Sequence, residues 1–360
     1  MITPTKRIHL IRLRFFLPLA VLLPLLIAFL FTGLDCKKDD PIDPGDTTHA
    51  PDTTSHSFRW EVDTIGTLYN YSPLDDIWGT SDSNVYGVGY VNRPSGQLPV
   101  NIMHWDGRKW TAIEYSVGYL SSIYGFASND IWAVGHGFGN PSFYGLVAHW
   151  DGNSWRTWKF SQYPSLLSIW GTSSRNLYAV GAGGVILKYD GVLWVQVPSG
   201  VGGIIKGIWG VSNNEIYAVG NYSETDSGFV LKFDGSRWRK LIESRYKTSK
   251  PSGELVAVWS ARSNNFLIDS YAGHDSTWEK FGWPNDNTYI DKIRGTGGNN
   301  IFACGSFDLI MHFNGKTFKR YDFYKKPYGG RLTGIYVSEK CVFVSGESED
   351  SRGIVYRGYH

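Results

Sequence analysis

The chain has 360 residues, of which 42% are hydrophobic and 16% aromatic, with 35 Lys and Arg against 33 Asp and Glu. Four of the bases but only one of the acids lie in residues 1–35, which leaves 31 bases and 32 acids in the remainder. A neutral chain lacks the concentrated basic surface that phosphate binding requires, so composition argues against nucleic acid as a partner.

Residues 1–35 are predicted to be a targeting segment that takes no part in the fold. A basic region precedes the apolar run from Phe15 to Leu34, and small residues stand shortly before Cys36. The arrangement resembles the signal peptide of a bacterial lipoprotein, which implies cleavage and lipidation at Cys36, although Asp35 stands where that pattern has a small residue. The alternative is an uncleaved membrane anchor, because the run approaches the roughly 20 residues that span a bilayer. Both interpretations place the rest of the chain outside the cytoplasm.

Residues 36–57 are predicted to be a disordered tether. An acidic patch after Cys36 leads into a tract of Pro, Asp, Thr, Gly and His from Pro41 to Ser57, which has too little apolar content to bury a core. The patch resembles a surface-export signal of bacterial lipoproteins. That resemblance implies display at the outer membrane or the cell surface.

From residue 58 onward the sequence repeats. The motif Asp-Gly-x-x-Trp begins at Asp106, Asp151, Asp190 and Asp234, with a weaker copy at Asn314. An apolar run before each copy carries an aromatic residue, at Trp78, Tyr124, Trp170, Trp209, Trp259 and Tyr336, with Arg294 in the slot of the sixth unit. Successive units are 46, 46, 39, 50, 35 and 42 residues apart, which is typical of β-propeller blades.

Each unit predicts four short antiparallel strands. In the third unit we expect them at 166–170, 176–180, 185–189 and 194–197, with the third and fourth joined by Asp190-Gly191, where Gly accepts the positive φ of a tight hairpin. Such a sheet has two apolar faces, so copies must stack in a ring. An isolated strand at 58–62 and a last unit that lacks its fourth strand predict that the N-terminal strand pairs with the C-terminal blade. The prediction is an all-β, seven-bladed β-propeller over residues 58–360.

The fifth unit departs from the pattern. Between Phe266 and Trp278 there is room for only a stunted third strand, and the Asp-Gly turn is replaced by residues 274–277. The unit predicts a three-stranded blade or one absorbed into a neighbour, so six blades stay open as the alternative. Cys304 and Cys341 fall at opposite ends of neighbouring predicted strands, which favours two buried free thiols over a disulfide.

A basic residue recurs on the predicted third strand, at His104, His149, Lys188, Lys232, His312 and Arg357. Because the repeat template supplies it, we expect it to pair with a turn carboxylate or a carbonyl and not to form a cationic ring for a ligand. The Asp residues of the turns lie in different blades, so they cannot converge on one Ca²⁺ ion. No His spacing is typical of zinc, and we expect no metal and no cofactor.

The Asp-Gly-x-x-Trp turn is similar to the Asp-box of sialidases, although those have an extra residue between Asp and Gly. The units as a whole resemble Asp-box propellers and photosystem II assembly-factor-like propellers, over nearly the whole chain after the leader. The resemblance implies the fold and leaves the function open, because propellers host many activities. A sialidase needs an arginine triad, and the arginines that lie off the template are Arg93, Arg245, Arg262, Arg294 and Arg331.

The expected function is that of a membrane-tethered, non-catalytic scaffold that binds protein or glycan as a monomer; the alternative is a carbohydrate-active enzyme. In a four-stranded meander, the second–third and fourth–first connections share one face, and here those connections are long and variable. Variable loops on a rigid ring are where binding resides. Their aromatic residues suit stacking on sugars or anchoring of a protein partner: Tyr90, Phe138, Tyr144, Tyr222, Tyr246, Trp283 and Tyr328.

Overall fold

The computed structural model describes residues 53–68, 70–94, 97–139, 142–225, 227–244, 255–274, 277–283, 289–323 and 329–360. The chain divides into two compact units, residues 1–50 and 51–360, and every described residue belongs to the second. Cys36 and most of the predicted tether therefore lie outside the described residues. In the part that is described, no helix is long and apolar enough to cross a bilayer.

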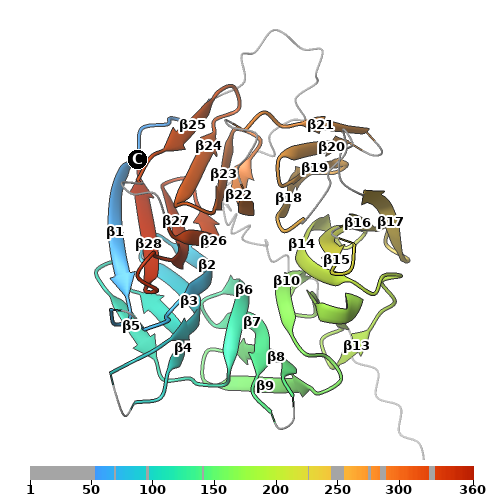
Figure 1. Cartoon of the computed structure of the whole chain (residues 1–360), viewed down its shortest axis with the longest axis horizontal. Coiled ribbons are helices and arrows are strands. Elements are labelled where there is room, and N and C mark those ends of the chain that lie inside the picture. Colours follow the sequence, from blue (N-terminus) through green and yellow to red (C-terminus); the bar gives the residue numbers. More distant parts are fainter. Residues whose placement is uncertain are drawn as a thin grey trace, which may run out of the picture. The chain divides into compact units, whose positions relative to one another are not determined.

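Seven four-stranded antiparallel sheets surround a central axis (Figure 1). Blade 1 contains β2 (Leu74–Ser81), β3 (Asn84–Val91), β4 (Val100–Trp105) and β5 (Trp110–Ile113). Blade 2 contains β6 (Tyr119–Ala127), β7 (Asp130–Gly137), β8 (Tyr144–Trp150) and β9 (Trp155–Phe160). Blade 3 contains β10 (Leu166–Ser173), β11 (Asn176–Gly181), β12 (Ile186–Tyr189) and β13 (Trp194–Gln196), with the 3-10 turn η1 (Ala182–Gly184) before β12.

The later blades follow the same order. Blade 4 contains β14 (Ile204–Ser212), β15 (Glu215–Tyr222), β16 (Ser227–Phe233) and β17 (Trp238–Ser244). Blade 5 contains β18 (Val258–Arg262), β19 (Asn265–Ile268), β20 (Tyr271–His274) and β21 (Thr277–Lys280). Blade 6 contains β22 (Ile290–Gly297), β23 (Asn300–Gly305), β24 (Leu309–Phe313) and β25 (Phe318–Tyr321). Blade 7 contains β26 (Arg331–Val337), β27 (Cys341–Glu347), β28 (Gly353–Tyr359) and, as its outer strand, β1 (Arg59–Ile65).

The seven-bladed prediction is confirmed, and the six-bladed alternative is wrong. The innermost strands β2, β6, β10, β14, β18, β22 and β26 contact one another in that order, and β26 returns to β2. The fifth blade was expected to lose a strand or to merge with a neighbour, but it has all four. Three of its strands have only four residues each, which is how the blade fits into the shortened unit.

Apolar packing between neighbouring blades forms the core. One cluster of buried residues joins Ile65 and Leu74 to Phe343 and Val355 across the boundary of blades 7 and 1. Comparable clusters lie at the other boundaries, such as Val88 and Ile102 of blade 1 against residues of blade 2. This arrangement follows from the strand pattern, because a four-stranded sheet with two apolar faces buries both only between two copies of itself.

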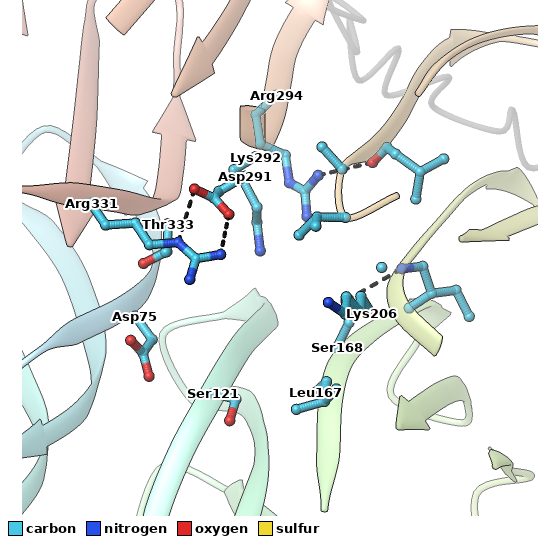
Figure 2. A pocket seen from close by; sticks show the side chains of 15 residues that line it. Asp75, Ser121, Leu167, Ser168, Lys206, Asp291, Lys292, Arg294, Arg331 and Thr333 are labelled. Atoms are coloured by element: carbon cyan, nitrogen blue, oxygen red, sulfur yellow. Dashed lines mark hydrogen bonds and ion pairs between the residues drawn. The ribbon is translucent and has the colours of Figure 1, made fainter. Parts of the chain in front are cut away.

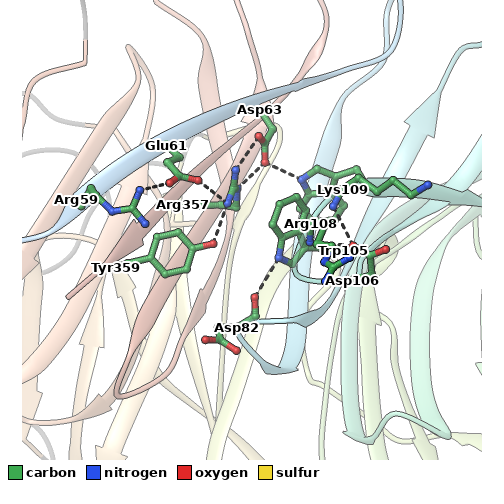
Figure 3. Close-up of polar contacts among 11 residues, drawn as sticks. Arg59, Glu61, Asp63, Asp82, Trp105, Asp106, Arg108, Lys109, Arg357 and Tyr359 are labelled. Carbon is green, nitrogen blue, oxygen red and sulfur yellow. Dashed lines mark hydrogen bonds and ion pairs between the residues drawn. The ribbon is translucent and has the colours of Figure 1, made fainter.

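Closure of the ring by the N-terminal strand is confirmed as well. β1 pairs antiparallel with β28 from Arg59 opposite Tyr359 to Ile65 opposite Gly353. The Arg357 guanidinium donates to Asp63 at 2.6 and 2.9 Å, forms an ion pair with Glu61 at 2.9 Å, and lies 4.1 Å from the Trp105 ring of blade 1 (Figure 3). These contacts tie the first strand, the last strand and the first blade together, so the ends of the chain lock the ring.

Residues 53–58, most of which the sequence assigned to the tether, pack against blade 6. His56 Nδ1 lies 2.9 Å from His312 Nδ1, and the Phe58 ring is 5.4 Å from Phe302 and 4.0 Å from His360. These contacts extend the folded unit beyond the pairing of β1. We call residues 53–58 the N-terminal strap.

The two cysteines of the propeller are free and buried, as expected. Cys304 lies in β23 and donates from its thiol to the Leu332 carbonyl at 3.3 Å, while Cys341 begins β27 and contacts Ser338. Burial raises the pKa of both thiols. They act as small packing residues.

Candidate functional site

The connections between strands divide the ring into two unlike faces. First–second and third–fourth strand turns form the turn face; second–third and fourth–first connections form the loop face. On the turn face, Asp151 Oδ1 accepts the backbone N–H groups of Asn153 and Ser154, both at 2.8 Å, and Gly152 has a φ of 93°. These bonds lower the pKa of the Asp151 carboxyl. The same arrangement occurs at Asp106, Asp190, Asp234 and Asn314, which confirms that these residues are structural.

The recurring basic residue also serves the blade template. His149 stacks 3.8 Å from the Trp132 ring and bonds to Asp130 at 2.9 Å, and His104 lies 4.5 Å from the Tyr86 ring at a tilt of 30°. The polar partner is the residue that begins the second strand: Asn84, Asp130, Glu215 and Asn300 for His104, His149, Lys232 and His312. In these four blades the basic residue pairs within the template, as predicted, but its partner is a side chain of the second strand, so the predicted turn carboxylate or carbonyl is wrong.

Exposed hydrophobic side chains gather on the loop face. Phe138 and Phe143, on the connection after β7, are each 55% exposed, and the loops of this face expose five further large apolar side chains. The turns of the opposite face contribute two among the described residues, Val192 and Leu193. The loop-face set comprises Leu68, Tyr71, Leu98, Phe138, Phe143, Tyr289 and Phe307. Three more exposed apolar residues lie on outer strands: Val62, Val195 and Leu241. An exposed apolar surface concentrated on one face is typical of an interaction site.

Rings from blades 1 and 2 and the loop before β2 form a continuous aromatic patch on this face. Tyr119 stacks 6.1 Å from Tyr90 and 5.2 Å from His136, and Phe138 and Phe143 meet His136 edge-on at 5.7 and 5.3 Å. The Tyr71 hydroxyl lies 3.2 Å from that of Tyr119. We call these six residues the aromatic patch: Tyr71, Tyr90, Tyr119, His136, Phe138 and Phe143.

A second exposed aromatic region lies on blade 6. Phe307 has a φ of 64°, a left-handed conformation that is an outlier for a bulky residue. Such strained residues cluster at functional sites. The neighbouring Ser306 donates its backbone N–H to the Tyr289 carbonyl at 3.2 Å and forms a bridge to Arg331. Exposed rings therefore flank the central axis at blades 1 and 2 and again at blade 6.

A cavity of about 300 Å³ lies on the axis, at the end where the innermost strands begin, and we call it the axial pocket. In six blades, the innermost strand has a β-bulge near its start, between residues such as Leu74 and Asp76 of β2. The residue between them has no partner on the second strand. The bulged residues all line the pocket: Asp75, Ser121, Leu167, Lys206, Asp291 and Thr333. A bulged residue is not paired with the neighbouring strand, and its side chain points in a different direction from those of the paired residues. The blade structure therefore does not require one residue type at this position, which explains why it varies between units.

Charged side chains dominate one wall of the pocket (Figure 2). Arg331 donates to both carboxylate oxygens of Asp291, at 2.5 and 3.1 Å, and the Lys292 ammonium lies 2.9 Å from Asp76 Oδ2. Arg294 lies beside them and Lys206 lies across the pocket. No group of three or more His, Cys, Asp or Glu among the described residues is arranged to hold a metal.

Asp75 connects the pocket to the aromatic patch. Burial, with smaller contributions from the charges of Asp76 and Glu347, raises the pKa of its carboxyl to about 7, against hydrogen bonding from Tyr119 and the charge of Arg331. Burial and the Asp75 charge also raise the pKa of Tyr119. An activated nucleophile needs the opposite shift, so this tyrosine and carboxylate pair does not have the properties of a catalytic nucleophile and its base.

Aromatic residues of the innermost strands lie deeper in the ring, and one of the seven is replaced. Arg294 occupies that position in blade 6, and its guanidinium lies 4.3 Å from the Trp209 ring of blade 4. It donates to the carbonyls of Ile293 at 2.7 Å and Val258 at 3.3 Å. Tyr124 approaches Trp209 at 6.2 Å. The cation therefore closes the bottom of the pocket against aromatic rings.

The predicted ligand-face residues have different surroundings. Tyr90 and Phe138 belong to the aromatic patch, and half-buried Tyr144 begins β8 close to it. Tyr222 is half-buried and packs 5.0 Å from Phe229. Trp283 is only 5% exposed and donates to the Asp269 carbonyl at 3.2 Å, so its expected exposure is wrong. Tyr246 and Tyr328 lie outside the described residues, and binding by any of the seven stays a prediction.

The off-template arginines do not converge as a set of three. Arg294 and Arg331 line the axial pocket, but Arg93 pairs with Glu114 at the periphery and Arg262 ends β18 on the turn face. Arg245 lies outside the described residues. The off-template arginines that the structure describes thus do not form the triad that a sialidase needs.

Sequence reasoning missed the axial pocket as a site. The aligned units contained a sign of this pocket. Two of them have charged residues between the apolar residues that the other units share, at Leu74-Asp75-Asp76-Ile77 and Ile290-Asp291-Lys292-Ile293. The sequence also marked Arg294 as the exception in an aromatic column. Departures from the template mark a site only when they converge, and convergence required the ring.

No model of a protein family matches the sequence, and no curated protein matches it. Solved structures match the fold at low identity. YCF48 bound to D1 peptide has a TM-score of 0.56 at 16% identity, covering 84% of this chain and 97% of that one. YCF48 from Cyanidioschyzon merolae has a TM-score of 0.54 at 15% identity, covering 84% and 98%. The WD40 β-propeller domain of Doa1 has a TM-score of 0.58 at 11% identity, covering 83% and 97%. The chain is thus a seven-bladed β-propeller of the shape that these proteins share.

Proposed function

We propose that the protein is a membrane-tethered, extracytoplasmic and non-catalytic scaffold that binds a protein partner on its loop face. The observation that carries the proposal is the concentration of exposed apolar side chains on the loop face, which has seven of them against two on the described turns of the opposite face. A protein partner is favoured over a glycan because the set includes Leu68 and Leu98 as well as aromatic rings, and aliphatic side chains offer no stacking surface to a sugar. The bound D1 peptide of YCF48, a protein of similar fold, supports the choice.

The enzyme alternative has weaker support. A carbohydrate-active propeller would need a nucleophile and converging arginines, whereas the pKa of Tyr119 is raised and the described arginines are dispersed. The aromatic patch fits a binding function without further groups. Tyr and Phe rings bury large areas with few rotatable bonds, which suits the centre of an interface.

Capture from an envelope extract tests the scaffold proposal. The compact unit from residue 51 onward is immobilised as wild type, as Phe138→Ser with Phe143→Ser, and as the control Val192→Ser with Leu193→Ser on the turn face. We expect the loop-face variant to lose partners that the control retains, by tenfold or more in bound amount for a hot-spot pair. Equal capture by the two variants would show that the loop face is not the recognition surface.

Anchoring is part of the same proposal, on the sequence evidence for Cys36. We expect Cys36→Ala to abolish lipid labelling and to leave the precursor at full length. A variant that still carries lipid, or a wild type that never does, would favour the uncleaved anchor.

A further inference from the structure

The floor of the axial pocket holds more positive than negative charge. Lys292 and Arg294 both reach it from β22, and Asp76 of β2 is the carboxylate beside them. Burial lowers the pKa values of both cations, and Lys292 and Arg294 repel each other. Two cations therefore share one anion at the floor of the pocket.

Asp76 is already fully engaged. Its Oδ2 accepts from Lys292 at 2.9 Å, from the Ser122 hydroxyl at 2.7 Å and from the Ile123 N–H at 3.2 Å, and its Oδ1 accepts from the Ile77 N–H at 3.0 Å. A carboxylate offers about four acceptor sites, so Asp76 has none to spare for a second cation.

Arg294 is held by neutral groups. Its contacts are the two backbone carbonyls and the Trp209 ring, and the described part of the chain brings no carboxylate within ion-pair distance of it. The other charges of the pocket do not change this, because Asp291 is bound by the fork of Arg331. The Asp76 charge acts on Arg294 only from beyond ion-pair distance. A partly buried cation without an ion pair of its own is costly, so the site is suited to an incoming anion.

Lys292 and Arg294 together exceed Asp76 by one positive charge. This single excess charge favours an anion that carries one negative charge. A monoanionic carboxylate would neutralise it and would match the planar fork of a guanidinium. A phosphate dianion would add negative charge beside Asp75 and Asp291. The cavity of about 300 Å³ is large enough for a carboxylate with several attached atoms, and it opens on the loop face.

We propose that the axial pocket binds the carboxylate group of a ligand, with Arg294 and Lys292 as its cationic partners and the Trp209 ring behind Arg294. The proposal rests on the proposed function in one respect, that the ligand arrives on the loop face. The carboxylate comes either from a peptide, as a C-terminus or an acidic side chain, or from a small free acid, and the same chemistry serves both.

The test measures thermal unfolding of the full chain with matched probes at equal ionic strength. Acetyl-glycyl-glycine offers a C-terminal carboxylate, acetyl-glutamic acid amide offers a side-chain carboxylate, and acetate offers a free acid; acetyl-glycyl-glycine amide and chloride are the neutral and ionic controls. A ligand that binds only the folded state raises the melting temperature with its concentration. We expect such a rise with at least one carboxylate probe and none with the amide, and the probe that is effective identifies the source.

Variants locate the effect. Arg294→Met is expected to weaken binding of the effective probe by tenfold or more and to raise the melting temperature without ligand, because it removes an unpaired cation. Arg294→Trp restores the aromatic residue of the other blades and replaces the Met variant if that one does not fold. The control is Arg93→Met, which removes a cation from the periphery and should retain the full response.

Three results would overturn the proposal: a wild type that responds equally to the amide or to chloride, a larger response to inorganic phosphate than to any carboxylate, or an unchanged response in the Arg294 variants. Each is independent of partner capture by Phe138 and Phe143. The pocket can therefore fail while the scaffold proposal stands, and the reverse.

Discussion

The turn face and the loop face are built from the same strands and have opposite properties. On the turn face, the side-chain oxygen of the Asp or Asn that begins each hairpin turn accepts hydrogen bonds from two backbone N–H groups. Two apolar side chains are exposed in the described turns. On the loop face, the connections vary in length and sequence, and seven large apolar side chains are exposed in the described part. The six bulges present five types of side chain to the axis. The contacts that stabilise the fold therefore recur from blade to blade, whereas the residues available for recognition differ between blades. Changes on the first face should cost folding, and changes on the second should cost binding.

Removal of the closing strand should have the largest effect, because both faces depend on an intact ring. Deletion of residues 58–64 takes β1 from blade 7 and with it the packing of Trp60 on Tyr321 and Phe323 and the bonds of Asp63 to Arg357. We expect a loss of at least about 3 kcal/mol in the free energy of unfolding, from an exposed edge and lost aromatic packing. Denaturant unfolding measures it, and an unchanged midpoint would contradict closure.

Asp75 should give the loop face a characteristic pH response. Its folded pKa of about 7 is above the usual 3.8 of an aspartate side chain, so the folded state retains a proton that the unfolded state has lost. Stability should therefore fall as pH rises from about 4 to 7. Asp75→Asn should raise the free energy of unfolding by about 2 kcal/mol at pH 8 and leave it unchanged at pH 4. Chemical unfolding at both pH values provides the measurement. A gain that is the same at both would mean that the carboxyl does not titrate there.

His312 should give the turn face the opposite response. It lies at 0% exposure under the N-terminal strap, and its folded pKa of about 3 lies below the 6.5 of an unperturbed histidine, so the unfolded state binds the extra proton. Stability should rise with pH between about 3 and 6.5. At pH 5 the free energy of unfolding should be about 2 kcal/mol lower than at pH 7. The contact between Nδ1 of His56 and Nδ1 of His312 also requires one bare nitrogen. Melting of wild type and His312→Gln at pH 5 and 7 tests this, and a loss of equal size in both proteins would exclude His312 as its source.

A single hairpin of the turn face should contribute less. Gly191 has a φ of 96°, and an added Cβ would lie 2.9 Å from Arg175 Cγ. Gly191→Ala is expected to cost about 1 kcal/mol and to leave partner binding unchanged, because the strain is local to the turn. Thermal unfolding and the capture experiment measure the two effects. Loss of binding without loss of stability would invert the assignment of the two faces.

Exposed rings of the loop face should contribute least to folding. Phe138→Ser with Phe143→Ser removes two side chains that are each 55% exposed, so the stability change should stay within about 0.5 kcal/mol while capture is lost. A melting temperature that falls as far as in the Gly191 variant would show that these rings serve packing.

The sequence supported the fold because each blade repeats local rules. The Asp-Gly dipeptides, the alternating strands and the orphan strand with Trp60 each act within a few residues, and their recurrence was sufficient to predict seven blades and their closure. The fifth unit misled because its strands are shorter than the template predicts, although their pairing survives. Trp283 misled because a loop position says nothing about burial, and its indole packs 5.3 Å from Phe318 of the next blade.

The sequence by itself determined the architecture and the face on which the variable loops lie, since alternating strand direction assigns every connection to one side. Only the tertiary structure decided what that face contains. Asp76 and Lys292 stand 2.9 Å apart but belong to blades 1 and 6, and Arg294 crosses from blade 6 to Trp209 of blade 4. A period of 35 to 50 residues places such side chains far apart along the chain, and closure of the ring brings their innermost strands around one axis. Local rules therefore predict the blade, and only closure of the ring creates the pocket.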